Sequence, residues 1–166
     1  MHGIGLAHDI AITLNKELLE PPSRPQGARI RTLLVDDSPV ALELLGHFLS
    51  SLSEIEVVGT AKDGEQAQAQ AEFARPDLIL ADLEMPRISG LELTMMLRRK
   101  FPSMRLVIIS THEGPVWEQL SHEHGADAFV PKRAVVAMLP ALVERLFAGA
   151  TLPVVPQPEP TAANTK

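Results

Sequence analysis

The sequence predicts an α/β fold in which a parallel sheet of five strands is covered by helices on both faces. Two observations support this fold class. Short apolar runs alternate five times with segments of helical periodicity, which is the order that repeated βα units produce. The apolar runs are nearly continuous instead of alternating with polar residues, as expected for strands buried on both faces. Right-handed crossovers between parallel strands then leave few topologies.

The first βα unit begins at Arg29. The run Arg29–Val35 is rich in β-branched and aliphatic residues and is predicted to be a strand. Ser38 and Pro39 then supply an N-cap and a first-turn proline, so a helix is expected to begin there. Its apolar face is expected to include Leu44, Leu45, Phe48 and Leu52.

The second unit has equally clear limits. A second strand is predicted over Ile55–Ala61. Asp63 and Gly64 open an alanine-rich helix that reaches about Ala74, and Pro76 prevents its continuation.

The remaining three units follow the same pattern. The third strand is predicted over Leu78–Ala81, followed by a helix from Ser89 or Gly90 to Lys100. Its basic end, Arg98 to Lys100, is expected to be solvated and to complement the helix dipole. The fourth and fifth units are predicted as strand Leu106–Ile109 with helix Pro115–His124, and strand Ala128–Val130 with helix Val135–Phe147.

Two terminal segments are predicted to lie outside the domain, which we place at residues 29–149. Residues 1–28 form an N-terminal extension that ends in a proline-rich linker. Ile10, Leu14 and Leu18 recur at four-residue spacing, so this extension contains either a short amphipathic helix or a frayed tail. Residues 150–166 carry four prolines and finish in small polar residues, and we expect this tail to be disordered.

Composition excludes several function classes. A chain of 166 residues with 45% hydrophobic content accommodates one domain with a full core. The net charge is −6 and no basic run exceeds three residues, so direct nucleic-acid binding is not expected. The chain has no cysteine and no long apolar run, which argues against disulfides, thiolate metal sites and membrane insertion. We expect a cytoplasmic protein.

The polar residues that follow the predicted strands are the candidates for chemistry. Asp36 and Asp37 follow the first strand, Asp82 follows the third, Ser110 ends the fourth, and Lys132 comes just after the fifth. The carboxyl ends of parallel strands meet at one edge of a sheet, where ligands bind. These five residues are therefore expected to share one crevice.

Residues of these types at one place predict phosphoryl transfer. Three crowded carboxylates repel one another and favour a bound cation, and an all-oxygen site suits Mg²⁺. Lys132 and the metal would neutralise a phosphoryl group while Ser110 donates to its oxygens. A carboxylate can be the covalent acceptor. In the alternative interpretation, the three aspartates only cap turns and helices and carry out no chemistry. That role would not require the whole set of acidic, hydroxyl and lysine residues.

Residues 30–147 resemble the receiver domains of bacterial two-component response regulators. The resemblance rests on five segments, which cover about 70% of the chain in the family's order: Leu33 to Ser38, Ala61 to Gly64, Pro76 to Pro86 with Gly90, Val107 to Ser110, and Gly125 to Lys132. It implies a flavodoxin-like (βα)5 fold, doubly wound, with strand order 2-1-3-4-5 and three αβα layers.

The resemblance also implies a role for each site residue. Asp82 is the phosphoacceptor for a histidine kinase or a phosphotransfer protein. Asp36, Asp37 and Asp82, with the backbone carbonyl of Glu84, hold Mg²⁺. Ser110 and Lys132 contact the phosphoryl oxygens and, with Asp82, carry out the transfer.

The switch implied by the family involves Ser110 and the aromatic Phe129. Phosphorylation is expected to change the surface formed by the fourth helix, the fifth strand and the closing helix, which then controls a downstream protein or a homodimer. Glu84, Thr111 and His112 occupy positions that tune phosphate lifetime in the family. One departure is that Pro131 precedes Lys132, whereas many receivers carry a proline after the lysine.

Two other function classes remain open at this level. A binding-only pseudo-receiver would have the fold without using phosphate, and labelling by acetyl phosphate that is lost on Asp82→Ala would exclude it. A small hydrolase with Asp82 as nucleophile would turn over model phosphoesters. Since fewer than 20 residues follow the last predicted helix, we expect no output domain, no enzymatic activity beyond the chain's own phosphorylation and dephosphorylation, and a separate downstream partner.

Overall fold

The computed structural model describes residues 28–148. Five parallel strands form one sheet in the order β2-β1-β3-β4-β5, which confirms the predicted flavodoxin-like fold. Residues 1–27 of the N-terminal extension, for which a short helix and a frayed tail are the two alternatives, and the tail at 150–166 lie outside the described residues. The strands are β1 Ile30–Val35, β2 Ile55–Ala61, β3 Leu78–Asp82, β4 Arg105–Ser110 and β5 Ala128–Pro131.

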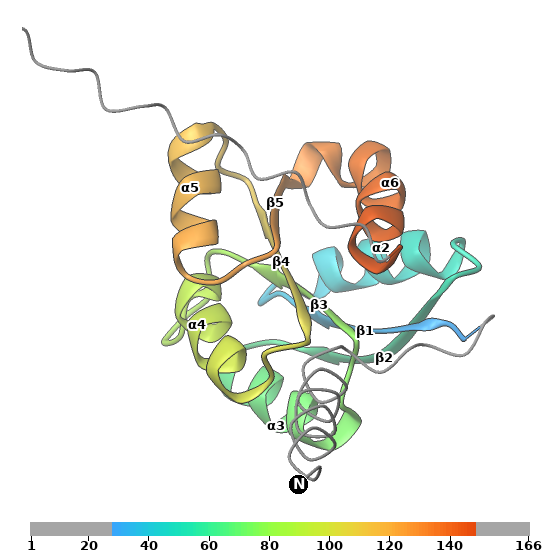
Figure 1. Cartoon of the computed structure of the whole chain (residues 1–166), viewed down its shortest axis with the longest axis horizontal. Coiled ribbons are helices and arrows are strands. Elements are labelled where there is room, and N and C mark those ends of the chain that lie inside the picture. The colour runs from blue at the N-terminus through green and yellow to red at the C-terminus, as the bar shows by residue number, and fades with distance from the viewer. Residues whose placement is uncertain (1–27, 149–166) are drawn as a thin grey trace, which may run out of the picture.

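The helices cover both faces of this sheet (Figure 1). Helices α2 and α6 pack on one face, and α3, α4 and α5 pack on the other. A short 3-10 turn, η1, covers Lys132–Ala134 between β5 and α6. The helices are α2 Pro39–Ser50, α3 Gly64–Ala74, α4 Gly90–Lys100, α5 Pro115–Glu123 and α6 Val135–Phe147.

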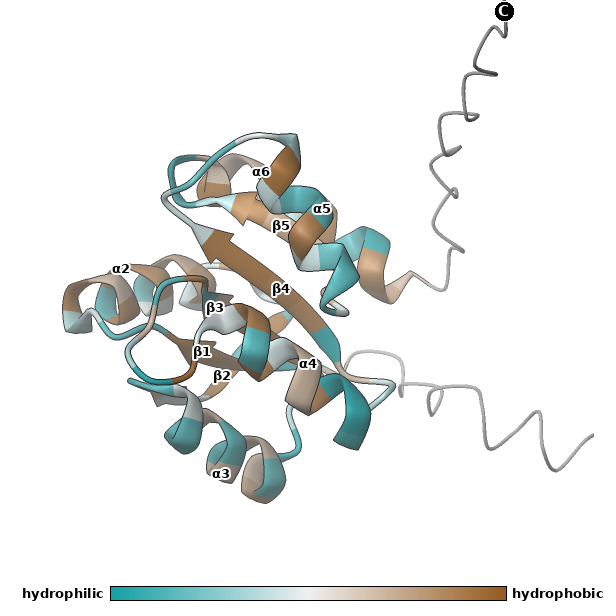
Figure 2. Ribbon diagram, turned by 90° about the vertical axis from the view of Figure 1, so that its left-hand side faces the viewer, coloured by the Kyte–Doolittle hydropathy of each residue, from teal (hydrophilic) through white to brown (hydrophobic). Residues whose placement is uncertain are grey.

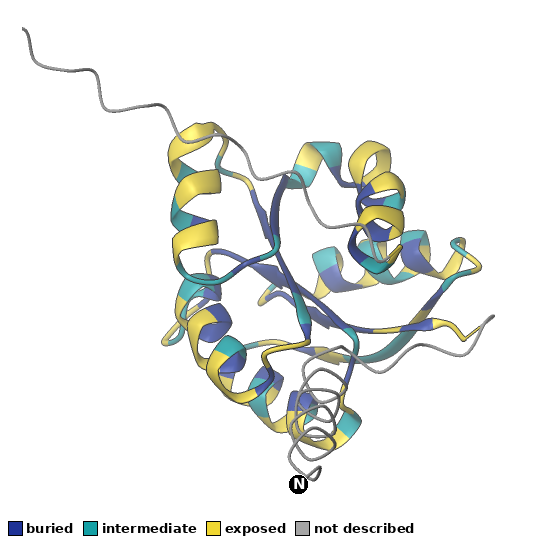
Figure 3. Ribbon diagram, in the orientation of Figure 1, coloured by how far each residue is buried: buried dark blue, intermediate teal, exposed yellow. Residues whose placement is uncertain are grey.

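The strands supply both halves of the core because their side chains alternate between the two faces. Leu33 and Val35 of β1 point to the α3 and α4 side, whereas Leu34 points to the α2 and α6 side. The central strands are apolar (Figure 2) and buried (Figure 3), as predicted from their continuous apolar runs. Full burial of one such side chain stabilises the fold by about 1.5 to 3 kcal/mol.

Side-chain caps fix where three helices begin. Ser38 accepts a hydrogen bond from the Ala41 amide and caps α2, as predicted, and Asp63 caps α3 in the same way. Ser89 caps α4 in a capping box with Glu92, so this helix begins at Gly90.

The predicted buried face of α2 is partly wrong. Leu44 is 66% exposed, whereas the buried side chains of this helix are Leu42 and Leu49. Residues seven apart lie on the same side of a helix, and Leu44 is two residues from Leu42, so it points to the opposite side. Leu45, Phe48 and Leu52 pack against the core at its edge, as predicted.

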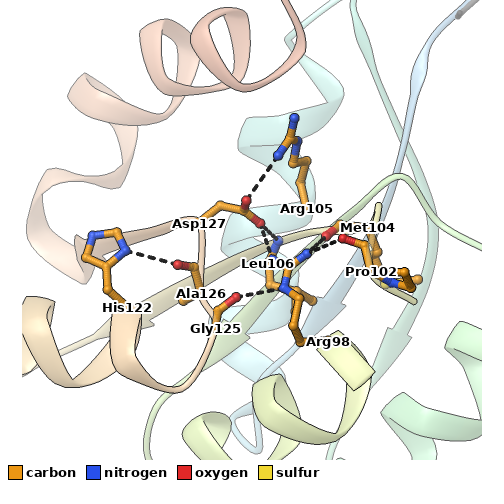
Figure 4. A network of polar contacts seen from close by, with 9 residues as sticks. All are labelled: Arg98, Pro102, Met104, Arg105, Leu106, His122, Gly125, Ala126 and Asp127. Carbon is orange, nitrogen blue, oxygen red and sulfur yellow. Dashed lines mark hydrogen bonds and ion pairs between the residues drawn. The ribbon is translucent and has the colours of Figure 1, made fainter. Parts of the chain in front are cut away.

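The basic end of α4 is not fully solvated, contrary to the prediction. The Arg98 side chain is 26% exposed and donates to three backbone carbonyls and to Asp127 (Figure 4). These carbonyls belong to Pro102 and Met104, in the loop after α4, and to Gly125, in the loop before β5. They replace water as hydrogen-bond acceptors for the guanidinium. Lys100 is exposed, as predicted, and forms an ion pair with Glu72.

Across residues 28–148, none of the helices combines the length and the apolar character that a membrane crossing requires.

Candidate functional site

The carboxylates of Asp36, Asp37 and Asp82 meet at the carboxyl edge of the sheet. Asp36 and Asp37 directly follow β1, and Asp82 is the last residue of β3, the neighbouring strand. One oxygen of each residue lies within 4.8 Å of one oxygen of each of the others. Asp36 and Asp82 are buried and Asp37 is exposed, so the cluster opens to solvent on the Asp37 side.

The ammonium of Lys132 lies between the two buried carboxylates. Its Nζ is 2.7 Å from Asp36 Oδ2 and 2.8 Å from Asp82 Oδ1. Lys132 opens the turn after β5, so the chain brings it to the site from the far edge strand of the sheet. Pro131 does not prevent this arrangement, because an edge strand tolerates a missing amide donor at its end.

The remaining carboxylate oxygens accept hydrogen bonds from the local backbone. Asp36 Oδ1 accepts from the Ser38 amide at 2.9 Å, and Asp82 Oδ2 accepts from the Glu84 amide at 3.1 Å. Gly90 allows the backbone to close around Asp82, since a Cβ at that position would lie 2.2 Å from the Asp82 carbonyl oxygen. Both acidic side chains are therefore held in one orientation before any ligand arrives.

One lysine does not neutralise the whole cluster. Burial raises the pKa of Asp82; hydrogen bonding and charge from Lys132 oppose this shift, and the charge of Asp36 adds to it. For Lys132, burial disfavours the ammonium, but hydrogen bonds and charges of Asp36 and Asp82 outweigh it and raise its pKa. Both shifts follow from one ammonium in contact with two carboxylates. Two anions favour the charged form of Lys132, whereas for Asp82 the single cation does not outweigh the effect of burial.

The donor set fits a hard divalent cation. It consists of carboxylate oxygens on two neighbouring loops, one of them solvent-exposed, with no nitrogen or sulfur ligand. Mg²⁺ takes one or two protein carboxylates and keeps several waters, which an open acidic cluster allows. Asp36, Asp37 and Asp82 could hold such an ion, and its charge would offset the repulsion that Lys132 leaves.

Ser110 ends β4, the neighbour of β3 in the sheet, and Phe129 lies on the edge strand β5. Ser110 is fully buried at the end of β4, and its hydroxyl accepts a hydrogen bond from the His112 amide at 3.0 Å. Its described contact is thus with the following loop. Phe129 is 8% exposed and belongs to the core on the α3 and α4 side of the sheet.

Glu84, Thr111 and His112 form a polar contact at the rim of the site. The Glu84 carboxylate accepts from Thr111 Oγ1 at 3.3 Å and lies 3.0 Å from His112 Nε2. The His112 ring stacks on Trp117 of α5, with centroids 4.4 Å apart. Sequence reasoning named the three polar residues but missed their mutual contact and the link to α5, because no spacing pattern relates position 84 to positions 111–117.

A second missed contact joins the loop after β4 to the turn after β5. Glu113 forms an ion pair with Arg133, the residue next to Lys132. Both side chains are exposed, Arg133 more than Glu113, so this pair contributes little to stability. It does place the two loops side by side around the site.

The geometry brings together two buried carboxylates, an ammonium in contact with both, and an acidic cluster that could hold a cation. This set can bind a phosphoryl group and offset its charge. A buried carboxylate whose oxygen is in contact with an ammonium is also suited to act as a covalent acceptor.

Comparison with known proteins matches most of the described residues to one domain family. Residues 32–144 match the family model described as "Response regulator receiver domain". A protein-glutamate methylesterase/protein-glutamine glutaminase of Pyrococcus abyssi is 37% identical over 107 residues, which are 64% of this chain and 29% of that relative. Response regulator GacA of Pseudomonas viridiflava is 32% identical over 72% of this chain and 56% of its own length.

Solved structures give the same result. The response regulator domain of Thermotoga maritima CheB has a TM-score of 0.67 and 30% identity, covering 74% of this chain and 99% of that one. The signal receiver domain of the NarL regulator from Mycobacterium tuberculosis has a TM-score of 0.69 and 27% identity over the same shares. The chain spans less than two thirds of the length of the curated relatives named here.

Proposed function

The chain belongs to the response regulator receiver domain family, and from that premise we propose that it accepts a phosphoryl group on Asp82 in a two-component signalling pathway. The donor is a phosphohistidine, carried by a histidine kinase or a phosphotransfer protein. The observation that carries the proposal is the position of Lys132 Nζ between Asp36 and Asp82. Among residues 28–148, the side-chain partners of this ammonium are Asp36 and Asp82, which belong to the acidic cluster.

The transfer follows from the chemistry of these groups. An ionised oxygen of Asp82 attacks phosphorus, the phosphorus–oxygen bond forms as the phosphorus–nitrogen bond of the donor breaks, and the imidazole leaves with its electron pair. Lys132 neutralises charge on the phosphoryl oxygens, and the Ser110 hydroxyl donates to one of them. Mg²⁺, held by Asp36, Asp37, Asp82 and the Glu84 carbonyl, would supply the additional positive charge that this step requires.

The buried state of Asp82 makes that positive charge important. A carboxyl group must be ionised to attack, and burial raises the pKa of Asp82. A cation at the cluster favours the ionised form and so increases the fraction of reactive carboxylate at neutral pH.

Phosphorylation would switch a surface through Ser110 and Phe129. New phosphoryl oxygens attract the Ser110 hydroxyl and release it from the His112 amide, which changes the β4–α5 loop. Phe129 then repacks, and the surface formed by α5, β5 and α6 changes shape. This surface would bind a downstream protein or a second copy of the chain in the phosphorylated state only.

The relatives limit how far the proposal extends. They include methylesterases and transcriptional regulators, and the chain spans only part of each. The proposal therefore concerns the receiver, at residues 29–149, its phosphorylation and the surface that responds. The methylesterase activity named for some relatives is not proposed for this chain.

Labelling with acetyl phosphate tests the proposal directly. The protein is incubated with acetyl phosphate and Mg²⁺, and an acyl phosphate sensitive to hydroxylamine is measured by intact mass. We expect labelling of the natural sequence, no labelling of Asp82→Asn, and no labelling after chelation of Mg²⁺. Glu56→Gln, which removes an exposed carboxylate on β2, is the matched control and should be labelled normally.

Two results would contradict the proposal. Labelling of Asp82→Asn at the natural rate would place the acceptor elsewhere. Absence of any labelling of the natural sequence, also with a phosphorylated histidine kinase as donor, would leave a binding-only receiver fold.

A further inference from the structure

Strand β5 leads directly to Lys132, and it is the shortest strand of the sheet. It has four residues, lies at the edge of the sheet, and pairs with β4 alone. The register pairs Ala128 with Val107 and Pro131 with Ser110. A slip of one residue would move the strand by about 3.3 Å and turn its side chains to the opposite face. The contacts of Lys132 at 2.7 and 2.8 Å would not survive such a slip.

Asp127, directly before β5, forms two hydrogen bonds with Leu106 of β4, one as donor and one as acceptor. Its backbone amide donates to the Leu106 carbonyl at 2.7 Å. Its Oδ2 accepts from the Leu106 amide, also at 2.7 Å. The side chain thus completes a ring with Leu106 that is compatible with a single register of β5 against β4.

Arg98 of α4 holds Asp127 in this position, as Figure 4 shows. Its Nη2 donates to Asp127 Oδ2 at 2.6 Å, and its Nε donates to the Gly125 carbonyl at 2.9 Å. Its Nη1 donates to the carbonyls of Pro102 and Met104 at 2.7 and 2.8 Å. A planar guanidinium reaches four acceptors in this way, whereas the single nitrogen of a lysine does not.

Two neighbours complete the arrangement. Arg105 Nη1 donates to the other oxygen, Asp127 Oδ1, at 3.1 Å. Gly125 has φ of +95° and packs on the stem of Arg98, where a Cβ would lie 3.2 Å from Cγ. The Asp127 side chain is 12% exposed, so its ion pair with Arg98 is shielded from solvent more than a surface pair is.

We propose that Arg98 and Asp127 are positioning residues for phosphoryl transfer, which set the register of β5 and thereby place the Lys132 ammonium against Asp82. This inference rests on the proposed function of Asp82. It assigns to α4 and to the loop before β5 an effect on chemistry at the opposite end of the strand. The effect acts through Lys132 and not through any contact with the phosphoryl group.

A double-mutant cycle separates positioning from general stabilisation. The maximal rate of labelling by saturating acetyl phosphate and Mg²⁺ is measured for Arg98→Gln, Lys132→Gln and the double variant, well below their melting temperatures. We expect Arg98→Gln to lower the rate about tenfold alone, and by less than about twofold when Lys132 is already replaced, because residues acting as a unit are not additive.

Two further variants keep the test decisive. Arg98→Lys keeps the positive charge but not the planar guanidinium with its several donors. We expect this variant to lose most of the labelling rate. Asp127→Asn serves if Arg98→Gln does not fold, and should show the same dependence on Lys132. Lys100→Gln, which breaks the exposed ion pair with Glu72 at the same end of α4, is the control and should label at the natural rate.

Amide hydrogen exchange examines the register without phosphate. We expect Arg98→Gln to lose protection at Ala128–Val130 while β1 and β3 stay protected. Unchanged protection, or an equal rate loss with and without Lys132, would overturn the inference. If the natural sequence is not labelled at all, the proposed function fails, and the exchange measurement alone still decides whether Arg98 holds β5.

Discussion

Lys132 and Asp36 are 96 residues apart in the chain, yet Lys132 Nζ lies 2.7 Å from Asp36 Oδ2. The same ammonium contacts Asp82, so one cation serves two buried carboxylates. Because burial raises the pKa of Asp82 despite this ammonium, we expect the acidic cluster to cost stability when no metal is bound, and variants of Asp82 should reveal that cost.

Replacing Asp82 by asparagine should stabilise the metal-free protein. The amide keeps the shape of the carboxylate, removes a charge that burial disfavours, and leaves Lys132 paired with Asp36. We expect the melting temperature at pH 7.5 with a chelator to rise by a few degrees, about what 1 kcal/mol produces in a domain of this size. Calorimetry measures it, and a melting temperature below that of the natural sequence would contradict the pKa direction.

This stabilisation should depend on pH with a definite sign. The pKa of Asp82 is higher in the folded than in the unfolded state, so the folded protein binds more protons between the two values and loses stability as pH rises through them. The advantage of Asp82→Asn should therefore be absent below pH of about 4 and complete above the raised pKa.

Mg²⁺ should stabilise the natural sequence, and this stabilisation should depend on the Asp37 carboxylate. Past saturation, each tenfold increase in Mg²⁺ should add about 1.4 kcal/mol to the free energy of unfolding. Asp37 is exposed, so Asp37→Asn should change metal-free stability by less than about 0.5 kcal/mol while weakening Mg²⁺ binding at least about tenfold. Thermal melts across a Mg²⁺ titration, with Glu56→Gln as control, distinguish this result from an unspecific salt effect.

Glu84 and His112 should control the lifetime of the phosphorylated state as a pair. Their side chains are 3.0 Å apart at the rim, and truncation of either should admit water to the acyl phosphate. We expect Glu84→Ala and His112→Ala each to shorten the phosphate half-life about two- to tenfold, the range that one hydrogen bond implies, with the double variant no faster than the singles. Glu113→Gln, in the same loop, should leave the half-life unchanged, and additive effects would show that the two act separately.

The same substitution at two glycines should have opposite effects. A Cβ at Gly90 would lie 2.2 Å from the Asp82 carbonyl oxygen, so Gly90→Ala must displace backbone at the site. It should cost about 1 to 3 kcal/mol and slow labelling. A Cβ at Gly46, within α2, meets nothing within 4 Å, so Gly46→Ala should stabilise by about 0.5 to 1 kcal/mol. Denaturant unfolding measures both, and equal signs would contradict the close approach at Gly90.

Several features of the protein followed from the sequence by itself. The order of strands and helices was predictable because period and capping residues are local properties, as at Ser38 and Ser89. The placing of Asp36, Asp82 and Lys132 at one edge was predictable because parallel strands all end there.

Other features were decided only by the tertiary structure. Leu44 and Leu42 are equally apolar, and only the packing of α2 on the sheet selects which of them is buried. The sequence predicts Arg98 to be part of a solvated helix end. In the folded protein the loops at Pro102 and Gly125 place their carbonyls within hydrogen-bonding distance of it. Likewise, His112 meets Glu84 and Trp117 through side chains from three segments. Such contacts depend on the distances between remote parts of the chain, to within a fraction of an ångström. Residue spacing predicts only the face of its own helix or strand on which a side chain lies.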